Sequence, residues 1–325
     1  MSYSVTQESF DSLASCGVEP NRLSWDCFFV LPVWVKVWWQ NFGGEEELYL
    51  VAVRQADKIT GIAPLMIKDG TASFLGSTDV SDCLDFVITP GLERDFFTVL
   101  LDDLKQKGVS NLDLKSLRPD STVLNHLVNI ARERGYEVFS QPEDFSLEVV
   151  LPSTWEEYLA ILTTKQRHEV RRKLRRLLEA GKIDYRIIED REAVNKAMDT
   201  FLKMFSESRS DKAAFLTGQR EVFFRALANS LAEAGLLRLG ILEVDSVPAA
   251  MVMCFDYNDC IYLYNSGYDG QYDPLSVGLL SKVLYIKESI QKGKKKFDFL
   301  RGNETYKHHL GGREIPLHSC RITIK

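Results

Sequence analysis

The fold is decided by residues 265–312, which read NSGYDGQYDPLSVGLLSKVLYIKESIQKGKKKFDFLRGNETYKHHLGG. The periodicity of the apolar residues predicts a helix over about 276–292, preceded by a strand end and a turn rich in small residues. The alternating KFDFL predicts a short strand, and 304–310 a short helical piece. Strand, helix, strand and helix follow one another here, as in an α/β arrangement.

The residues before this stretch predict an antiparallel meander behind a group of helices. The runs LLRLGILEV, PAAMVMCFDY and CIYLYNSGY are short and apolar or alternating, and Asp245-Ser246 and Asn258-Asp259 separate them as turns. Helices are expected over about 164–180, 192–207 and 218–234.

Capping boxes predict where two of the helices in the second half begin. The spacings Ser153 to Glu156 and Thr163 to Gln166 are those of the motif. Gly181 is expected to end the second of these helices in a left-handed cap.

The first half predicts a second mixed lobe. An aromatic helix, PVWVKVWWQNF, precedes the strands ELYLVAVRQ and ITGIAPLMIKDG, and Pro64 in the latter indicates an edge strand or a bulge. Short strands TASFLG and DCLDFVI, helices over about 92–107 and 121–134, and the strand NLDLKSL follow. We place the end of this lobe near Leu151, which gives an N-terminal lobe of residues 1–151 and a C-terminal lobe of residues 152–325.

Composition limits the class of protein. A chain of 325 residues is long for one average domain, and 45% hydrophobic with 26% charged residues is ordinary for a globular protein. The formal charge of −6 argues against a general DNA binder. No apolar run is long enough for a membrane span, and the N-terminal residues lack the basic start and apolar run of a secretory signal peptide, so we expect a cytoplasmic protein. Its six cysteines show no zinc-ligand spacing, so reduced thiols and no metal are expected, although Cys254 and Cys260 flank one turn.

The stretch 265–312 closely resembles the C-terminal signature of the CelD/BioF2-like acetyltransferases, a FemAB-like branch of the GNAT superfamily. The matching residues are Ser276-Val277-Gly278, Asp298, Gly302, Glu304, Tyr306-Lys307 and Gly311. A second stretch, LTTKQRHEVRRKLRRLLEAGKIDY, looks like the helix that opens the second lobe of FemAB-like proteins. The resemblance implies an α/β (α+β) fold of two tandem GNAT-like lobes, each a mixed, mostly antiparallel sheet flanked by helices.

The implied reaction is transfer of an acyl group, most simply acetyl, from coenzyme A. The acceptor would be an amine or hydroxyl of a small metabolite, sugar or cell-envelope precursor, with phosphorylated acceptors included. One alternative keeps the fold but takes aminoacyl-tRNA as donor, as the FemAB peptidyl transferases do. Another is a catalytically silent binding protein in polysaccharide assembly.

The turn Ser276-Val277-Gly278 is the candidate cofactor-binding segment. Unpaired N–H groups at a helix start suit a phosphate, and the resemblance implies that coenzyme A docks its diphosphate here. The usual GNAT phosphate loop, Gln/Arg-x-x-Gly-x-Gly/Ala, is absent. An ordinary helix start capped by Ser276 is the alternative interpretation. Gly302 is assigned to the same role, as a turn close to the ligand or simply as a turn glycine.

Three residues are candidates for the chemistry. Asp298 is predicted to face away from Phe297 and Phe299 and to accept the amine proton, unless it forms an ion pair with Arg301 or Lys307. Tyr306 is a candidate donor to the departing thiolate, and Lys307 a candidate for stabilising the oxyanion or a phosphate. A purely structural role is the alternative for both.

The helix over 164–180 concentrates positive charge. Arg167, Arg171 and Arg175 recur every four residues, and an apolar stripe of Val170, Leu174 and Leu177 is expected to pack inward. The resemblance assigns binding of an acceptor phosphate to Lys165 and Arg167. A solvated face paired with acids such as Glu169 and Glu179 is the alternative.

Overall fold

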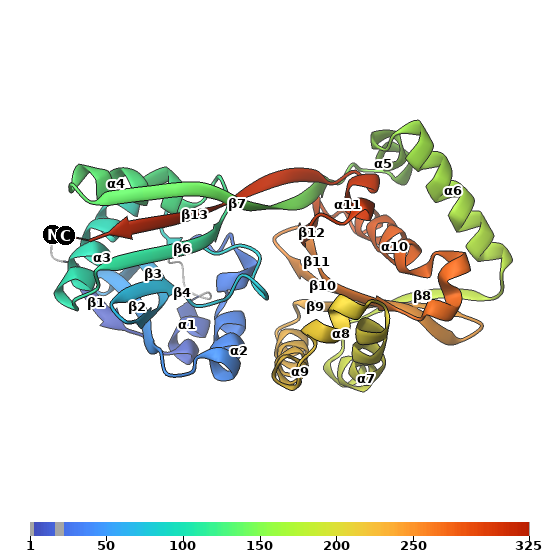
Figure 1. The fold of residues 1–325 in the computed structure, drawn as a ribbon, viewed down its shortest axis with the longest axis horizontal. Coiled ribbons are helices and arrows are strands. Elements are labelled where there is room, and N and C mark those ends of the chain that lie inside the picture. Colours follow the sequence, from blue (N-terminus) through green and yellow to red (C-terminus); the bar gives the residue numbers. More distant parts are fainter. Residues whose placement is uncertain (1–2, 17–22, 325) are drawn as a thin grey trace. The chain divides into compact units, whose positions relative to one another are not determined.

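The computed structural model describes residues 3–16 and 23–324, and these form two compact units (Figure 1). One contains the residues up to 145 together with those from 315 onward, and the other contains residues 146–314. The lobe division expected from the sequence put its boundary at 151 and the C-terminal strand in the second lobe. In the structure that strand pairs with a strand of the first unit, which explains the different grouping.

The first unit is a mixed sheet with helices. Its elements are β1 Tyr3–Gln7, α1 Phe10–Cys16, η1 Phe28–Val30, α2 Pro32–Phe42, β2 Glu47–Gln55, β3 Lys58–Lys68, β4 Thr71–Phe74, β5 Val87–Ile88, α3 Glu93–Gln106, β6 Asn111–Leu117, the π-helical turn η2 Val123–Leu127, α4 Val128–Glu133, the first part of β7 Glu137–Val150, and β13 Arg313–Thr323. Strands follow the order β1-β2-β3-β4-β6-β13, and only the β4–β6 pair is parallel. In α2, Trp34 and Trp38 are buried in this core.

Pro64 lies inside β3, which pairs with β2 on one side and with β4 and β5 on the other. The expected edge position is therefore wrong, and the expected bulge lies at Thr60, four residues away. The carbonyl of Pro64 accepts from the N–H of Leu75 at 2.8 Å, so the proline nitrogen faces the β4 side. It falls between the β3 residues that pair with β4 and those that pair with β5, where no N–H is needed.

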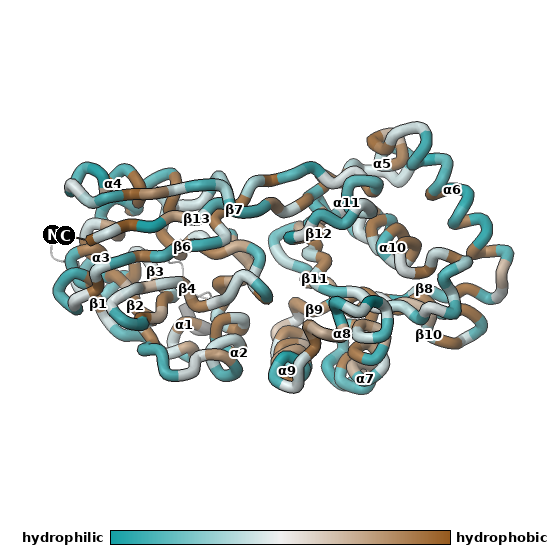
Figure 2. The backbone as a smooth tube through the Cα atoms, in the orientation of Figure 1, coloured by the Kyte–Doolittle hydropathy of each residue, from teal (hydrophilic) through white to brown (hydrophobic). Residues whose placement is uncertain are grey.

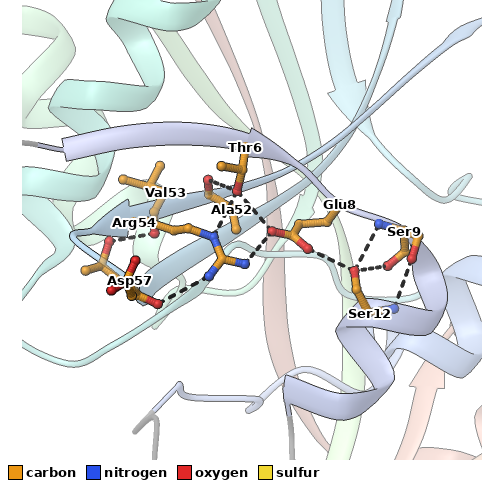
Figure 3. Close-up of polar contacts among 9 residues, drawn as sticks. Thr6, Glu8, Ser9, Ser12, Ala52, Val53, Arg54 and Asp57 are labelled. Carbon is orange, nitrogen blue, oxygen red and sulfur yellow. Dashed lines mark hydrogen bonds and ion pairs between the residues drawn. The ribbon is translucent and has the colours of Figure 1, made fainter.

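A polar network ties the N-terminal strand to the sheet (Figure 3). The Arg54 guanidinium donates to Glu8 at 2.7 Å and to the Thr6 hydroxyl at 3.0 Å. Ser12 of α1 donates to the other oxygen of Glu8 at 2.9 Å. Burial opposes ionisation of Glu8, but these hydrogen bonds outweigh it and lower the pKa of the carboxyl.

The second unit is a six-stranded sheet with helices on both faces. Its elements are the last residues of β7, then α5 Trp155–Ile161, α6 Thr164–Glu179, β8 Ile183–Ile188, α7 Arg191–Glu207, α8 Ser210–Phe215, α9 Gly218–Glu233, β9 Leu237–Val244, β10 Val247–Tyr257, β11 Cys260–Tyr268, η3 Gly270–Leu275, α10 Val277–Gln291, β12 Lys296–Arg301 and α11 Thr305–His309. The strand order is β7-β12-β11-β10-β9-β8, and only β11–β12 is parallel. Both sheets are therefore mixed and mostly antiparallel, as predicted.

Both predicted hairpins of the meander are present. Positive φ angles at Asp245 and Ser246, and again at Asn258 and Asp259, give each turn the backbone twist that matches paired strands. Figure 1 shows α10 on one side of β9–β11 and α7 and α9 on the other. At Gly267 of β11 an added Cβ would lie 2.4 Å from the backbone nitrogen of Phe205, so glycine allows α7 to pack directly on the strand.

Three local predictions in the helices need correction. The first capping box uses Thr154 and Glu157, one residue later than expected, whereas the box at Thr163 is confirmed. Gly181 does not adopt the left-handed conformation. An added Cβ there would lie 2.8 Å from the Asp245 carboxylate, which accepts the N–H of Lys182, so glycine leaves room for that contact.

The helix predicted over 121–134 also differs from the expectation. It begins with the π-helical turn η2 and continues as α4. Gly135 follows with φ 74°, which confirms the predicted stop.

Candidate active site

The site begins where β11 and β12 separate. β12 pairs with β11 only at Cys260, Ile261 and Tyr262, although β11 continues to Tyr268. A bulge between Asp298 and Leu300 and a left-handed Leu300, φ 61°, turn the end of β12. The two strands therefore diverge towards the start of α10 and α11.

The start of α10 has no side-chain cap. Ser276 occupies the N-cap position in the left-handed conformation, φ 56°, and its hydroxyl makes no capping bond. Its carbonyl accepts from Leu279 and Leu280. Within the described part of the chain, the N–H groups of Val277 and Gly278 donate to no acceptor. A 15-residue helix with free N–H groups presents positive potential at this end.

Gly278 lies against the ring of Tyr268. An added Cβ at Gly278 would lie 2.7 Å from that ring, so packing by itself requires glycine here. The alternative of an ordinary helix capped by the Ser276 side chain is not what the structure shows. The cofactor roles of Ser276, Val277 and Gly278 remain predictions.

Lys282 is buried one turn further along α10. Only 5% of the residue is exposed, and its ammonium donates to the carbonyl of Gly278 at 2.6 Å. The same nitrogen lies 5.0 Å from the centre of the Tyr306 ring. Burial, and secondarily the charge of Lys212, lowers the pKa of Lys282 to about 7.

Lys212 of α8 belongs to the same cluster. Its ammonium donates to the carbonyl of Ser266, near the end of β11, and lies 5.0 Å from the centre of the Phe205 ring. Burial and the charge of Arg209 lower the pKa of Lys212 to about 8. Arg209 itself is held by Asp211 through two bonds of 2.9 and 2.8 Å.

Lys307, the third member, is fully engaged. Its ammonium donates to the carbonyls of Arg301 and Leu300 at 2.6 and 3.2 Å and pairs with Glu304 at 2.9 Å. Two hydrogen bonds and one ion pair thus fasten α11 to the end of β12. We call Lys212, Lys282 and Lys307 the lysine cluster. Its members come from α8, α10 and α11.

Gly302 fits beside this pair. Its φ is 115°, and an added Cβ would lie 2.5 Å from a Glu304 carboxylate oxygen and 3.1 Å from the Lys307 ammonium. The close approach expected of this glycine is thus to the Glu304–Lys307 pair. Its cofactor role stays a prediction.

Tyr306 projects from α11 between Phe299 and Lys282. Its ring packs edge-on against Phe299 with centres 6.4 Å apart. Burial raises the pKa of Tyr306, so its hydroxyl stays protonated at neutral pH. A protonated hydroxyl of this kind is able to donate to a leaving group.

Asp298 lies on the other face of β12. The rings of Phe297 and Phe299 contact Tyr285 and Tyr306 on the α10 side, so alternation along the strand directs Asp298 away from that side, as predicted. The Asp298 carboxylate accepts the N–H of Leu300 at 2.8 Å and so supports the bulge. This geometry separates Asp298 from Tyr306, and its role as base stays a prediction without further support.

The basic helix α6 packs against α10 and η3 through a stripe that includes the buried Val170 and Leu177. Figure 2 shows α6 as largely hydrophilic. Arg171 pairs with Glu156, Arg172 and Lys173 with Glu169, and Arg175 with Glu179. The chain's own acids therefore meet much of the charge. Within the part of the chain that the structure describes, the Lys165 and Arg167 side chains make no hydrogen bond or ion pair.

Of the predicted residues, Gly278 and Tyr306 both contact Lys282, and Gly302 lies beside Lys307. The structure adds Lys282 and Lys212 to the candidates. One signal for Lys282 was visible, because it is the only charged residue between Val277 and Ile286. No sequence pattern marks Lys212.

Comparison with known proteins assigns this unit. The family profile described as an acetyltransferase (GNAT) domain matches residues 164–308. Over these residues the chain is similar to GNAT-type acetyltransferases. No curated protein is similar enough in sequence to count as a relative.

Solved structures share the fold of the whole chain. FemX superposes with a TM-score of 0.66 at 11% identity, covering 98% of this chain and 96% of that one. A conserved protein of unknown function from Bacteroides thetaiotaomicron gives 0.61 at 13%, covering 98% and 99%. L-PGS from Bacillus licheniformis gives 0.53 at 10%, covering 90% of each. At these low identities the superpositions show a shared fold and nothing finer.

Among residues 3–16 and 23–324, the structure contains no cluster of His, Cys, Asp and Glu that would hold a metal ion. Cys254 and Cys260 are free thiols. The same residues include no helix suited to crossing a membrane.

Proposed function

We propose that the GNAT domain transfers an acyl group, acetyl in the simplest case, from coenzyme A to an amine, or to a hydroxyl, of a small or precursor acceptor. The observation that carries this proposal is the uncapped start of α10 beside the diverging ends of β11 and β12. The free N–H groups of Val277 and Gly278 suit the diphosphate of coenzyme A.

The residues near the α10 start supply the remaining functions. Tyr306 is protonated and buried, which suits donation to the departing thiolate. Lys212 and Lys307 of the lysine cluster supply positive charge, which suits a thioester oxygen that becomes negative during attack.

Thermal unfolding tests the donor. Wild-type protein is heated with acetyl-CoA, longer acyl-CoAs and free CoA, because a ligand at 100 times its dissociation constant stabilises by about 2.7 kcal/mol. A saturable rise in the midpoint with acetyl-CoA is the expected result. Tyr306→Phe should keep that rise while losing turnover, and Tyr136→Phe in the first unit serves as the matched control.

A second donor, aminoacyl-tRNA, is favoured by one observation. Lys165 and Arg167 of α6 are free for an external phosphate. A rise in the unfolding midpoint with aminoacyl-tRNA, and none with any thioester, would favour aminoacyl-tRNA as the donor. A silent binding protein would bind neither donor and would tolerate Tyr306→Phe without functional loss.

A further inference from the structure

Lys282 is placed unlike an ordinary structural lysine. It occupies the buried face of α10 with Leu280 and Val283, and its ammonium has one acceptor, the Gly278 carbonyl. A buried ammonium has three donors to satisfy, and Lys307 has two carbonyl acceptors and an ion pair with Glu304. Lys282 thus retains hydrogen-bonding capacity beside the Tyr306 ring.

The charges around Lys282 do not balance its own. The groups that face it are Lys212 on α8, Lys307 on α11, Glu304 before α11 and the buried thiol of Cys254 on β10. Glu304 is the carboxylate among them, and it already pairs with Lys307 at 2.9 Å. Within the described chain, neither Lys282 nor Lys212 has a carboxylate within ion-pair distance. A proton on Lys282 is therefore poorly compensated.

This arrangement is costly for a protein that has no use for it. Burying an unpaired charge destabilises a fold, and an apolar side chain would fill the same place at no such cost. The lowered pKa of Lys282 means that much of it is a neutral amine near pH 7, the form that accepts protons.

We propose that Lys282 relays a proton in the acyl-transfer site, accepting it from the attacking amine and returning it to Tyr306. The proposal rests on the proposed function, because it needs a thioester donor. It assigns Lys282 as a catalytic residue and Lys212 as the positioning residue whose charge keeps Lys282 ready to accept.

The step balances within the site. The acceptor nitrogen attacks the thioester carbonyl and loses one proton to the Lys282 amine, which becomes an ammonium. The carbon–sulfur bond breaks, and the Tyr306 hydroxyl gives its proton to the departing thiolate. The new ammonium lies over the ring of the resulting phenolate, 5.0 Å from the ring centre, and returns a proton to it. Both side chains end as they began, and the products are the amide and the free thiol of coenzyme A.

The experiment uses the full chain with acetyl-CoA as donor and hydroxylamine as the acceptor amine, and follows the release of free thiol across pH 6 to 9. The variants are Lys282→Met, Lys282→Gln and Lys212→Met, and Lys287→Met on the same helix is the control. Binding of acetyl-CoA to each is measured separately by calorimetry, and folding by thermal unfolding.

We expect both Lys282 variants to bind acetyl-CoA like wild type and to lose at least about 100-fold in kcat, the usual contribution of a general base. The wild-type rate should rise through a midpoint near pH 7, a limb absent in these variants. Lys212→Met should move the midpoint to higher pH, because a like charge that lowers the pKa of Lys282 has been removed.

A wild-type rate and pH profile in folded Lys282→Met and Lys282→Gln would overturn the relay. So would loss of acetyl-CoA binding in these variants, since Lys282 would then be a binding residue. Absence of binding and turnover in the wild type itself is a different result, because it refutes the coenzyme A donor and removes the relay with it.

Discussion

Two basic regions of the second unit, α6 and the lysine cluster, differ in whether their positive charge is exposed and paired or buried and unpaired. On α6 the cations are mostly exposed, and several pair with Glu156, Glu169 and Glu179. In the cluster, Lys282 and Lys307 are buried, and Lys282 has no carboxylate partner in the described chain. Charge that is solvated and paired changes stability little, whereas buried unpaired charge lowers it. The cluster is therefore the stronger candidate for a function.

The comparison predicts a large gain in stability when the buried cation is removed. Lys282→Met should raise the free energy of unfolding at pH 7 by about 4 kcal/mol, since the pKa lies near 7 in the folded state and near 10.5 in the unfolded state. Denaturant unfolding measures the difference, and Lys287→Met should change it by less than about 0.5 kcal/mol. A loss of stability in Lys282→Met would contradict the comparison.

The dependence on pH sharpens the same point. As the pH falls, Lys282 becomes protonated in the unfolded chain at a higher pH than in the folded protein. The free energy of unfolding therefore decreases as the pH falls from about 10.5 towards 7. The advantage of Lys282→Met over wild type should accordingly shrink, from about 4 kcal/mol at pH 7 to about 1.5 kcal/mol at pH 9.5. Paired unfolding curves at the two pH values test this. An advantage independent of pH would show that packing, not charge, is responsible.

Gly302 tests how tightly the cluster is built. Gly302→Ala should destabilise by about 2 kcal/mol, because the new Cβ meets Glu304 and the backbone has φ 115°. Gly293→Ala is the matched control, since its φ is 73° and an added Cβ there meets nothing within 4 Å. The control should cost about 1 kcal/mol. Equal losses in the two variants would mean that the Glu304–Lys307 pair imposes no constraint.

The smallest effect is expected on α6. The Arg172 hydrogen bond lowers the pKa of Glu169 to about 2, yet both side chains are well exposed and solvent screens them. Glu169→Gln should cost less than about 1 kcal/mol, and added salt should reduce that loss. Unfolding at two ionic strengths measures it. A larger loss of stability that salt does not reduce would contradict the contrast, because the charges of α6 would then behave like the buried charges of the lysine cluster.

Sequence patterns sufficed for the parts of the fold that depend on local spacing. The meander, α10 and the α6 stripe follow from periodicity and turn residues, and both hairpin turns use the expected residue pairs. The position of Pro64 did not follow, because it depends on where β4 and β5 end along β3. The left-handed Ser276 was also hidden, since serine usually caps through its side chain.

The site was predictable where one segment carries it. Gly302, Tyr306 and Lys307 lie in one short segment, residues 302–307, and were found from the motif that this segment forms. Lys212 could not be found in this way, because 70 residues separate it from Lys282 and only the packing of α8 near β11 brings them together. Asp298 was found as a candidate because strand alternation predicts which face it occupies. Alternation does not predict that its carboxylate accepts a backbone N–H and supports a bulge.

Amide hydrogen exchange at the start of α10 tests the central claim most directly. The N–H groups of Val277 and Gly278 have no acceptor in the described chain and should exchange freely in the unliganded protein. The account predicts that saturating acetyl-CoA slows exchange at these two residues and leaves residues 165–167 unchanged. Unchanged exchange at 277–278 with acetyl-CoA bound would contradict it, because the donor would then occupy another place.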